Sequence, residues 1–585
     1  MRSGRSTAAT LGPSLASLAL AAACGDDPAP APVEPAPAPA ATAPAYADDG
    51  PYLLRDVTAD SGLAGFLQVN GDTEKPFIVE TVGGGCALFD ADQDGDLDAY
   101  LTNGGKLGRP VEENPSDALY LNDGSGRFAD ASASAGIDER RWSNGVRATD
   151  VDGDGVVDIF VTNYGCDTFW LGLGAARYAD RTQQCNLADT SWSTGAAFLD
   201  FDHDGDLDLY VANYVDFDEP RMLAERPTIE YQGVEVMKGP VGLAGAPDAF
   251  HVNEGGLRFR EASAELGLHD ELFGFQPVVF DFDLDGWIDV FVGNDSVANS
   301  LWRNKEGKGF EDVALRQGVA LSLSGRPQAC MGVALGDYDG DQRPDMYITN
   351  FADDYSTLYH GEERGFFSDV TQAVGLAAPT MAELGWGTGF VDFDLDGDVE
   401  IYAVNGHVYP QVDRFRLGTE YHQQVQLFES EGRRWREPAG RGGVALGVKA
   451  SARGSATGDV DGDGDVDLLV ENIDGPPRLL RNDGRTGKWV AVELRGAGAN
   501  RDAIGARLVG RVGARSIAHW IGSSHGFLST SERRAVFGLG DAGQLDALEV
   551  TWPGGEVERF GPLEAGSRWV VQQGDAGAAG KLVPK

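Results

Sequence analysis

A nine-residue acidic motif recurs seven times along this 585-residue chain, and it constrains the fold more than any other feature of the sequence. The copy at residues 459–467 reads D-x-D-x-D-G-x-x-D, with carboxylates at positions 1, 3, 5 and 9. Ca²⁺ binds six to eight oxygens at roughly 2.3–2.6 Å in flexible geometry. Carboxylates at positions 1, 3 and 5 can point inward from a tight loop, and glycine at position 6 permits the sharp turn. The motif therefore predicts a calcium-binding loop, in which a backbone carbonyl at position 7 and the carboxylate at position 9 complete the cage.

The seven copies are named here the first to seventh acidic loops, and all share one register. A single copy would equally suit a solvated acidic turn, but chance acidity does not align carboxylates seven times. An EF-hand loop ends with Glu at position 12 and continues into a helix, whereas residues 468–470 after the seventh loop suit a strand. The loop starts lie between 50 residues (Asp150 to Asp200) and 81 residues (Asp200 to Asp281) apart. This spacing indicates one small β-sheet per repeat.

The predicted ligands of up to seven Ca²⁺ ions are the acidic side chains of these loops. In chain order they are Asp90, Asp92, Asp94, Asp96 and Asp98; Asp150, Asp152, Asp154 and Asp158; Asp200, Asp202, Asp204, Asp206 and Asp208; Asp281, Asp283, Asp285 and Asp289; Asp337, Asp339, Asp341 and Asp345; Asp392, Asp394, Asp396, Asp398 and Glu400; and Asp459, Asp461, Asp463, Asp465 and Asp467.

The chain is strongly acidic, with a formal net charge of −45. The seven loops hold 32 of its 92 acidic residues, so much of the acidity belongs to the predicted sites. A surface of this sign argues against nucleic-acid binding, which needs Lys and Arg to displace counterions.

Residues 1–24 have the pattern of an export signal. Arg2 and Arg5 precede an Ala/Leu-rich run that ends at Cys24. A small-residue run before cysteine resembles a bacterial lipobox, which implies lipidation of Cys24; cleavage nearby by an ordinary signal peptidase is the alternative. Residues 25–50 are rich in Ala and Pro and predict an extended spacer. No later stretch is long and apolar enough to span a membrane, so we expect membrane contact only through the lipid.

From residue 51 each repeat predicts four short antiparallel strands, which is one propeller blade. Most repeats end near a "DVT…GL" segment, such as residues 369–376. The seventh repeat lacks this segment after Asn482, whereas residues 55–63 supply one at the start. The sequence therefore predicts an all-β fold, with a seven-bladed β-propeller at residues 51–484 that is completed by its own N-terminal strand.

Two further segments depart from the repeats. An insertion at about residues 216–248 lengthens the third repeat, and long loops on a rigid scaffold often carry function. From residue 485 the acidic loops stop, and alternating apolar segments predict a small C-terminal β-sandwich-like domain over residues 485–575, followed by a tail at 576–585.

The acidic loops and their flanking strands resemble FG-GAP/VCBS repeats, as in integrin α-subunit propellers. Residues 500–507 (NRDAIGAR), 537–540 (FGLG) and 550–555 (VTWPGG) resemble an ASPIC/UnbV domain. Residues 405–410 (NGHVYP) and 238–243 (KGPVGL) also match segments of such proteins. The arrangement over residues 51–575 is similar to that of the cartilage acidic protein family, and the resemblance implies that the loops bind Ca²⁺ between the first two strands of each blade.

Three positions depart from that pattern. Gln342 replaces glycine at position 6 of the fifth loop and Pro344 follows it, which predicts the weakest complete site because a left-handed conformation there is strained. Glu400 replaces Asp at position 9 of the sixth loop and keeps the carboxylate. Relatives often have a cysteine pair in the insertion, but here Lys238 precedes Gly239 and no cysteine is present.

Other features have weaker functional interpretations. Residues 522–526 (GSSHG) fit G-x-S-x-G, but an all-β setting lacks the strand–turn–helix of a nucleophile elbow, so a turn is expected. Residues 495–534 contain seven arginines and two acids, which suggests docking on the acidic propeller, binding of an anionic glycan, or a solvated face. The sequence leaves undecided whether Cys166 and Cys185 form a disulfide, and Cys86 and Cys330 are expected to be buried thiols.

The sequence favours an exported protein that is lipid-anchored to a bacterial membrane or cell surface, or otherwise secreted or periplasmic. Its predicted role is a surface binding or adhesion module for an extracellular protein or glycan, with the insertion, together with His407, as the preferred binding region. The alternative is a secreted enzyme that acts on a polymer such as a polysaccharide. No catalytic residues are assigned, since the loop carboxylates are engaged as metal ligands.

Overall fold

The computed structural model describes residues 46–187, 190–269, 271–438, 440–484 and 487–575, with the backbone of one further strand at Lys581–Val583. The predicted signal peptide, its lipidation site Cys24 and most of the Ala/Pro-rich spacer lie outside the described residues.

Seven four-stranded antiparallel sheets follow one another along the chain, and each has an acidic loop between its first two strands. In order their strands are β2 (Cys86–Phe89), β3 (Asp98–Leu101), β4 (Ala118–Asn122) and β5 (Phe128–Asp130); β6 (Trp142–Thr149), β7 (Asp158–Tyr164), β8 (Thr168–Gly172) and β9 (Tyr178–Asp180); β10 (Ser193–Leu199), β11 (Asp208–Asn213), β14 (Ala249–Asn253) and β15 (Phe259–Glu261); β16 (Gly274–Phe280), β17 (Asp289–Val297), β18 (Ser300–Asn304) and β19 (Phe310–Asp312), with β20 (Gln328–Ala329) beside β17; β21 (Val333–Gly336), β22 (Asp345–Ile348), β23 (Thr357–Gly361) and β24 (Phe367–Asp369); β25 (Gly385–Val391), β26 (Glu400–Asn405), β27 (Gln426–Glu431) and β28 (Arg434–Arg436); and β29 (Ala452–Gly458), β30 (Asp467–Asn472), β31 (Arg478–Asn482) and β1 (Leu54–Asp56).

The first strands of the seven sheets lie next to one another around a common axis. They contact in the order β2, β6, β10, β16, β21, β25 and β29, and β29 in turn contacts β2. Their side chains are largely buried, because each sheet packs its two faces against its neighbours. The predicted all-β propeller fold is confirmed. The acidic loops mark one end of the sheets, named the acidic-loop face; the opposite end is named the insertion face.

The N-terminal segment completes the seventh sheet. Strand β1 pairs antiparallel with β31, with Leu54 opposite Asn482 and Asp56 opposite Leu480. The Asp56 carboxylate lies 2.9 Å from the Arg478 guanidinium, so an ion pair joins parts of the chain that are 422 residues apart. The pairing expected from the missing fourth-strand segment is present.

Helices are short and lie between the sheets or in the insertion. Most are single turns that follow a fourth strand and end at a left-handed residue. They are α1 (Thr58–Ser61), α2 (Ser132–Ala135), α3 (Thr182–Cys185), α5 (Ser263–Leu266), α6 (Ala314–Gln317), α7 (Thr371–Val374) and α8 (Ala377–Thr380), with α4 (Glu219–Glu225) in the insertion and α9 (Gln411–Phe415) in the sixth repeat.

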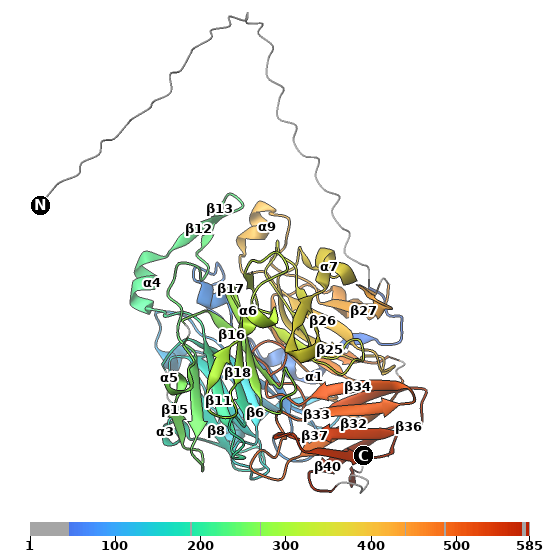
Figure 1. Ribbon diagram of the computed structural model, residues 1–585. Helices are drawn as coiled ribbons and strands as arrows, with labels where there is room; N and C mark the ends of the chain where they lie inside the picture. Colours follow the sequence, from blue (N-terminus) through green and yellow to red (C-terminus); the bar gives the residue numbers. More distant parts are fainter. Residues whose placement is uncertain are drawn as a thin grey trace, which may run out of the picture. The chain divides into compact units, whose positions relative to one another are not determined.

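Two sheets form the C-terminal domain, which groups at one end of Figure 1 in orange and red. Buried Val492, Phe537, Leu548 and Trp552 belong to its single apolar core, as expected of a β-sandwich. One sheet contains β35 (Ala535–Gly540), β32 (Lys488–Arg495), β40 (Ser567–Gln572) and β41 (Lys581–Val583); the other contains β34 (Arg515–Trp520), β33 (Arg507–Val512), β37 (Ala547–Thr551) and β38 (Val557–Phe560), and β36 (Gln544–Leu545) pairs with β39 (Leu563–Glu564).

The predicted segment boundaries shift slightly at both ends. The Tyr46 hydroxyl donates to the Val425 carbonyl at 3.5 Å, and the Gly443 N–H donates to the Ala47 carbonyl at 3.0 Å. The end of the predicted spacer is therefore part of the folded body from residue 46. Strand β41 lies within the predicted tail and pairs with β40.

Four cysteines lie in the described part of the chain, and all are free thiols. The disulfide left open between Cys166 and Cys185 is therefore not formed. Cys86 and Cys330 are buried, as predicted. Within the described residues, no helix has the length and apolarity needed to cross a membrane.

Removal of residues 51–63 should lower the melting temperature, although these residues lie more than 400 positions before β31, the strand with which β1 pairs. The deletion exposes the edge of β31 and removes the fully buried Leu54 side chain, and loss of one such side chain alone costs about 2–5 kcal/mol. Calorimetry of the chain from residue 25 measures the effect, with a deletion of residues 25–45 as control. Equal melting of the 51–63 deletion and the intact chain would contradict the proposed closure.

Candidate metal centres and ligand pocket

The backbone of each acidic loop folds around its first carboxylate. In the first loop, the N–H groups of Asp94 and Gly95 both donate to Asp90 at 3.1 Å, and the Asp96 N–H donates to Asp94 at 3.0 Å. Gly95 has φ +98°, the left-handed conformation that glycine adopts without strain. The same bond from position 6 to position 1 occurs in the second, fourth, fifth, sixth and seventh loops.

This turn brings carboxylate oxygens together in the first five loops. Potential ligand atoms of Asp90, Asp92 and Asp98 all lie within 4.8 Å of one another in the first loop. Equivalent sets occur in other loops: Asp150, Asp152 and Asp158; Asp200, Asp202 and Asp204; Asp281, Asp283 and Asp285; and Asp339 and Asp345 with His360.

The carboxylate at position 9 is buried and also holds the sheet together. Asp98 accepts the N–H of Ala91 and the N–H of Asn122, each at 2.8 Å, so it joins its loop to the end of the third strand. The Asp residues at this position in the second, third, fourth, fifth and seventh loops accept the same two bonds. Glu400 makes the bond to its loop, from Phe393 at 2.9 Å. A structural role was not expected for this position.

The loops have the donor set of a hard divalent cation. Asp150 and Asp200, at position 1, are 3% and 6% exposed, and one oxygen of each has no hydrogen-bond partner. Burial raises the pKa of Asp98 to about 7 and of Asp158 to about 8, with neighbouring carboxylates adding to the effect. Buried, partly unpartnered carboxylates are costly without a counter-charge, and an all-oxygen set suits Ca²⁺. The residues present therefore fit a bound calcium ion.

A cationic side chain from the third strand distinguishes some loops from others. Arg303 on β18 lies 2.8 Å from Asp283 and 2.9 Å from Asp285, and Arg481 on β31 lies 3.6 Å from Asp461. Apolar Leu121, Leu171 and Val252 occupy the equivalent register in the first three sheets. This difference was not predicted, although residues 301–304 (LWRN) and 479–482 (LLRN) carry it.

The fifth loop combines several departures. Gln342 has φ +67°, so this residue adopts the left-handed conformation usual for glycine. His360 Nδ1 lies 3.1 Å from Asp345 and 3.7 Å from Asp339, and its hydrogen bond to Asp345 raises the histidine pKa to about 9. Arg343 forms an ion pair with Asp341. Arg343 thus pairs with one carboxylate of this loop, and the His360 imidazole lies beside two others, where it can ligate a metal ion when neutral or balance their charge when protonated.

The C-terminal domain docks on the acidic-loop face through arginines. Arg568 lies 2.6 Å from Asp459, Arg501 lies 3.8 Å from Asp150, and Arg507 donates to the Gln342 carbonyl at 2.6 Å. Of the three interpretations of the arginine-rich stretch, docking on the propeller has structural support.

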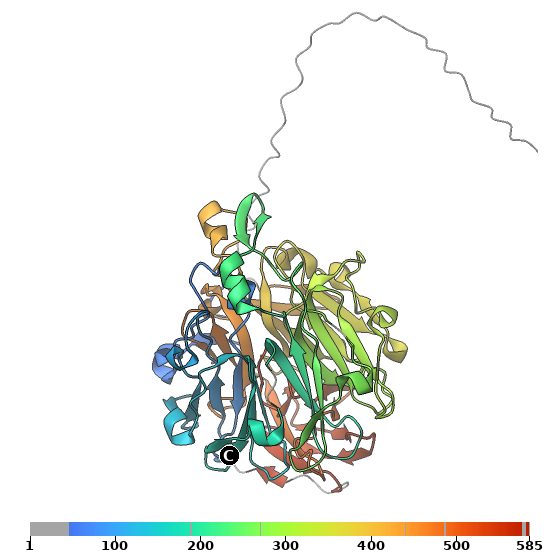
Figure 2. The same cartoon turned by 90° about the vertical axis from the view of Figure 1, so that its left-hand side faces the viewer.

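A loop of the C-terminal domain, named the axial segment (residues 521–534), enters the ring of first strands. Thr530 exchanges two backbone hydrogen bonds with β2, to Cys86 and from Leu88, each at 3.0 Å. The Leu528 N–H donates to the Gln276 side chain on β16 at 2.9 Å. Further bonds reach β6, β10 and β29. Figure 2 shows this domain, in red, at one end of the propeller, with the insertion at the other.

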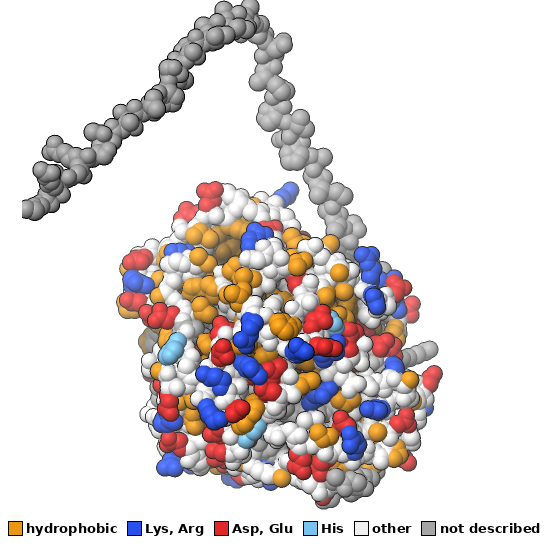
Figure 3. Space-filling model, viewed as in Figure 1, with side chains coloured by type: hydrophobic (Ala, Val, Ile, Leu, Met, Phe, Trp, Pro, Cys, Tyr) orange, Lys and Arg blue, Asp and Glu red, His pale blue; other side chains and the backbone are white. Residues whose placement is uncertain are grey.

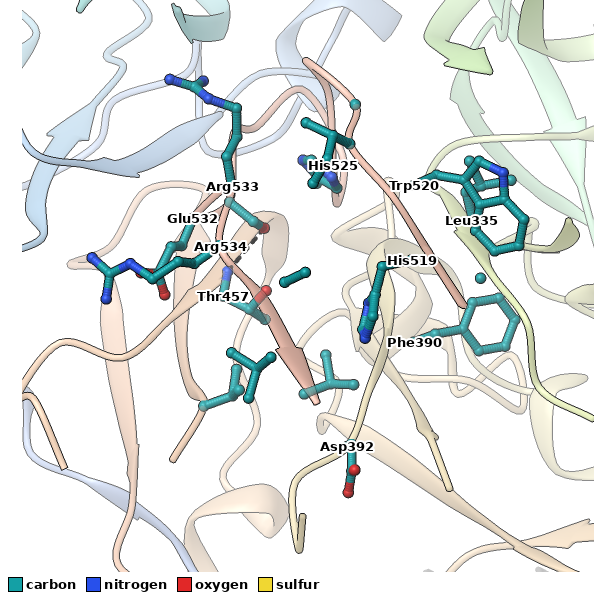
Figure 4. Close-up of a pocket in the computed structure, with 18 of the residues that line it drawn as sticks. Leu335, Phe390, Asp392, Thr457, His519, Trp520, His525, Glu532, Arg533 and Arg534 are labelled. Carbon is teal, nitrogen blue, oxygen red and sulfur yellow. Dashed lines mark hydrogen bonds and ion pairs between the residues drawn. The ribbon is translucent and has the colours of Figure 1, made fainter. Parts of the chain in front are cut away.

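The G-x-S-x-G motif lies in the axial segment and is a turn, as expected. The Ser523 hydroxyl donates to the Phe198 carbonyl at 2.9 Å, and the Ser524 hydroxyl to the Pro277 carbonyl at 2.6 Å. Nearby, His519 and His525 border a cavity of about 150 Å³ between the two domains (Figure 4). Burial lowers the pKa of both histidines to about 4, so both are neutral at physiological pH.

The insertion roofs a larger pocket, of about 490 Å³, on the propeller axis. The hairpin of β12 (Thr228–Tyr231) and β13 (Val234–Met237) crosses this face, and the Tyr231 hydroxyl and Gln232 amide donate to Asp353 at 2.8 and 2.9 Å. Figure 3 shows a hollow with hydrophobic side chains near the region labelled β12 and β13 in Figure 1. The lining side chains include Tyr214, Phe275, Asp295, Phe351, Trp386 and Tyr409.

The floor of this insertion-face pocket rests on the axial segment. The Phe527 ring centroid lies 5.0 Å from that of Trp386 and 5.6 Å from that of Phe275, both of which line the pocket. The C-terminal domain, which docks at the acidic-loop face, therefore supports the pocket at the opposite face.

His407 lies behind the pocket wall rather than in it. Its ring is fully buried, 5.5 Å from Phe351 and 5.4 Å from Tyr409, and its Nδ1 accepts the Tyr409 N–H at 3.0 Å. Burial lowers its pKa to about 3, with nearby Arg453 contributing. The structure gives His407 a packing environment, while the insertion does border the pocket.

The FG-GAP-like repeat model matches residues 90–161, 150–211, 281–348 and 337–403, and the ASPIC and UnbV model matches residues 496–578. The chain carries FG-GAP-like repeats and an ASPIC and UnbV domain. The matched FG-GAP-like repeats contain the first six acidic loops, and the ASPIC and UnbV domain contains the axial segment.

The chain is also similar to cartilage acidic protein 1. The match to the Xenopus tropicalis protein is 27% identical over 323 residues and covers 53% of this chain and 46% of that protein. The match to the Homo sapiens protein is 27% identical over 327 residues, covering 53% and 45%. The chain thus spans less than half the length of these relatives.

The solved structures that match this chain share little sequence with it. An Agrocybe aegerita lectin that recognises non-reducing terminal N-acetylglucosamine is 14% identical, with a TM-score of 0.36, and covers 63% of this chain and 89% of its own. The extracellular domain of a putative hybrid two-component system from B. thetaiotaomicron is 9% identical, with a TM-score of 0.40, covering 74% and 40%.

Proposed function

We propose that this FG-GAP-like repeat propeller is an exported, calcium-dependent binding protein whose ligand occupies the insertion-face pocket. The observation that carries the proposal is the pocket itself: a non-repeating insertion roofs an axial hollow of about 490 Å³ lined by aromatic side chains. Binding sites are commonly concave, largely apolar and supplied with a few polar groups. The proposed partner is an extracellular protein or glycan.

Calcium is assigned to the acidic loops as part of this proposal. The buried, unpartnered oxygens of Asp150 and Asp200 and the all-oxygen donor sets support it. Bound cations would neutralise carboxylates that otherwise repel one another within each loop. Their role is then to stabilise the sheets that position the pocket.

Export and lipidation at Cys24 are proposed from the sequence alone, with the anchored or secreted protein acting outside the cytoplasm. No specific observation favours the alternative function, a secreted enzyme that acts on a polymer. The position-9 carboxylates hold backbone N–H groups, and Ser523 and Ser524 donate to backbone carbonyls, so none of these groups is arranged as a nucleophile or general base.

Calcium should raise the melting temperature of the chain from residue 25. A ligand at 100 times its dissociation constant stabilises the folded state by about 2.7 kcal/mol per site. Calorimetry with EDTA, with added Ca²⁺ and with added Mg²⁺ measures this effect and its ion preference. The double variant D150N/D152N serves as a partial control, since it removes two carboxylates from the second loop. An identical midpoint in EDTA and in Ca²⁺ would refute the assignment.

The cationic side chain on the third strand should weaken Ca²⁺ binding at the loop that it faces. Replacing Arg303 with Leu, the residue at this register in the first sheet, should tighten Ca²⁺ binding at the fourth loop on the order of tenfold, because a charge a few ångströms from the ion is removed. The reciprocal variant Leu121→Arg should weaken the first loop. Native mass spectrometry at limiting calcium counts the bound ions. Unchanged occupancy in both variants would show that the arginine does not compete with the ion.

Replacing hairpin residues 228–235 with a short Gly/Ser linker should abolish ligand binding and leave the melting temperature nearly unchanged. Side chains at residues 228–235 are exposed or half-buried, and the buried Val236 and Met237 at the end of β13 are kept, so the replaced part contributes little to the core. Arrays of glycans and extracellular proteins measure binding. Tyr231→Phe is the matched control, since it keeps the ring and removes only the hydroxyl, which donates to Asp353 and accepts from the Gln232 amide. Full binding by the linker variant would place the ligand elsewhere.

A further inference from the structure

We propose that the insertion-face pocket recognises an organic cation, a protonated amine or quaternary ammonium group on an apolar body, with Asp295 as its carboxylate partner. This inference rests on the proposed binding function and names the chemical class of the ligand. It follows from the combination of aromatic walls and carboxylates within one pocket.

Aromatic rings form two neighbouring groups in the pocket lining. Tyr214 stacks on Phe275 with centroids 4.5 Å apart, and Phe275 lies 6.4 Å from Trp386. In the second group, Phe351 and Tyr409 are 6.1 Å apart. The Arg453 guanidinium already covers one face of Trp386, 4.1 Å from the ring centroid, so a ligand cation would meet the other rings. The faces of such rings attract cations, and quaternary ammonium groups are often bound in aromatic cages.

Three carboxylates line the same pocket: Asp295, Asp353 and Asp354. The hydrogen bonds that they accept come from neutral groups. Asp295 accepts the hydroxyls of Tyr214 at 2.7 Å and Ser296 at 2.8 Å. Asp353 accepts the Tyr231 hydroxyl and the Gln232 amide, and Asp354 accepts the Gln328 amide at 3.1 Å and the backbone N–H of Tyr355 at 2.8 Å. Their negative charge is thus solvated by dipoles rather than by a cation.

Asp295 is the most deeply placed of the three, with only 7% of its surface exposed. It lies on the extension of β17 that pairs with β20, where Asp295 is opposite Ala329, so a sheet holds its backbone in place. A nearby positive charge strongly stabilises the ionised form of a buried carboxylate. A ligand cation that enters between the aromatic groups would supply that charge.

The pocket also contains two basic residues of its own, and both bond within their own segments. Lys238 Nζ donates to the Gly242 carbonyl at 3.1 Å, and Arg326 Nε donates to the Ser324 hydroxyl at 3.4 Å. Neither bond involves the three carboxylates. An anionic ligand would meet these two residues but would also meet Asp295, Asp353 and Asp354, which favours a cation.

Paired probes of equal shape test the proposal on the chain from residue 25 with Ca²⁺ present. Calorimetric titration compares 2-phenylethylamine with neutral 2-phenylethanol, and benzyltrimethylammonium serves as the quaternary probe. We expect each cation to bind at least tenfold more tightly than the alcohol. Asp295→Asn keeps the side-chain shape and removes the charge, so it should abolish that preference and leave alcohol binding unchanged. Asp354→Asn, nearer the rim, should reduce the preference about threefold and provides a second variant if the first melts early.

The outcomes separate this inference from the proposed function. Equal affinity for amine and alcohol, or a preference that survives Asp295→Asn in a folded protein, would overturn the cation assignment. If, in that case, a neutral glycan or a protein still binds and needs the insertion hairpin, the binding function stands with a different ligand class. If neither the probes nor an array ligand binds, both proposals fail.

Discussion

The propeller depends on the hydrogen bonds that a buried carboxylate, at the end of each acidic loop, accepts from backbone N–H groups. Asp98 and five equivalent Asp residues each accept one N–H from their own loop and one from the end of the third strand. The loop, the second strand and the third strand are thereby fixed together. Asn122, whose N–H is one of these donors, also donates through its side chain to the Val460 carbonyl of the seventh loop at 2.7 Å, so the network extends between sheets. Removing such a carboxylate would leave the buried N–H groups that it binds without an acceptor.

The same carboxylates concentrate negative charge in each loop, and a bound cation would neutralise it. Burial raises the pKa of position-9 carboxylates such as Asp98 and Asp158, and the crowded carboxylates at positions 1 and 3 add to the unfavourable charge. In the fourth, fifth and seventh loops, Arg303, His360 and Arg481 supply part of the counter-charge from the protein itself. One repeated hairpin therefore supports two ways of neutralising its charge, and the repeats need not be equal as metal sites.

The C-terminal domain links the two faces of the propeller. Its axial segment gives hydrogen-bond partners to the inner strands, which would otherwise present unpaired backbone groups toward the axis. Its Phe527 ring then supports Trp386 and Phe275 beneath the insertion-face pocket. A domain that docks over the acidic loops can thus influence the shape of the pocket at the opposite face.

The sequence was sufficient for features encoded within one repeat. The loop register, the strand order and the pairing of residues near Leu54 with the last repeat all follow from local patterns. The pocket could not be predicted, because Tyr214, Asp295 and Tyr409 come from different repeats and share no motif. The position of the axial segment was equally hidden, since its Gly- and Ser-rich sequence reads as a turn. His407 attracted attention through its neighbours in sequence, yet it lies behind the pocket wall.

Anomalous diffraction from crystals grown with calcium tests the central claim most directly. The account predicts peaks between the carboxylates of positions 1, 3 and 5 in the first, second, third and sixth loops, with weaker or absent peaks in the loops that face Arg303, His360 and Arg481. An anomalous map without a peak in any acidic loop, from protein that is folded and saturated with calcium, would contradict it.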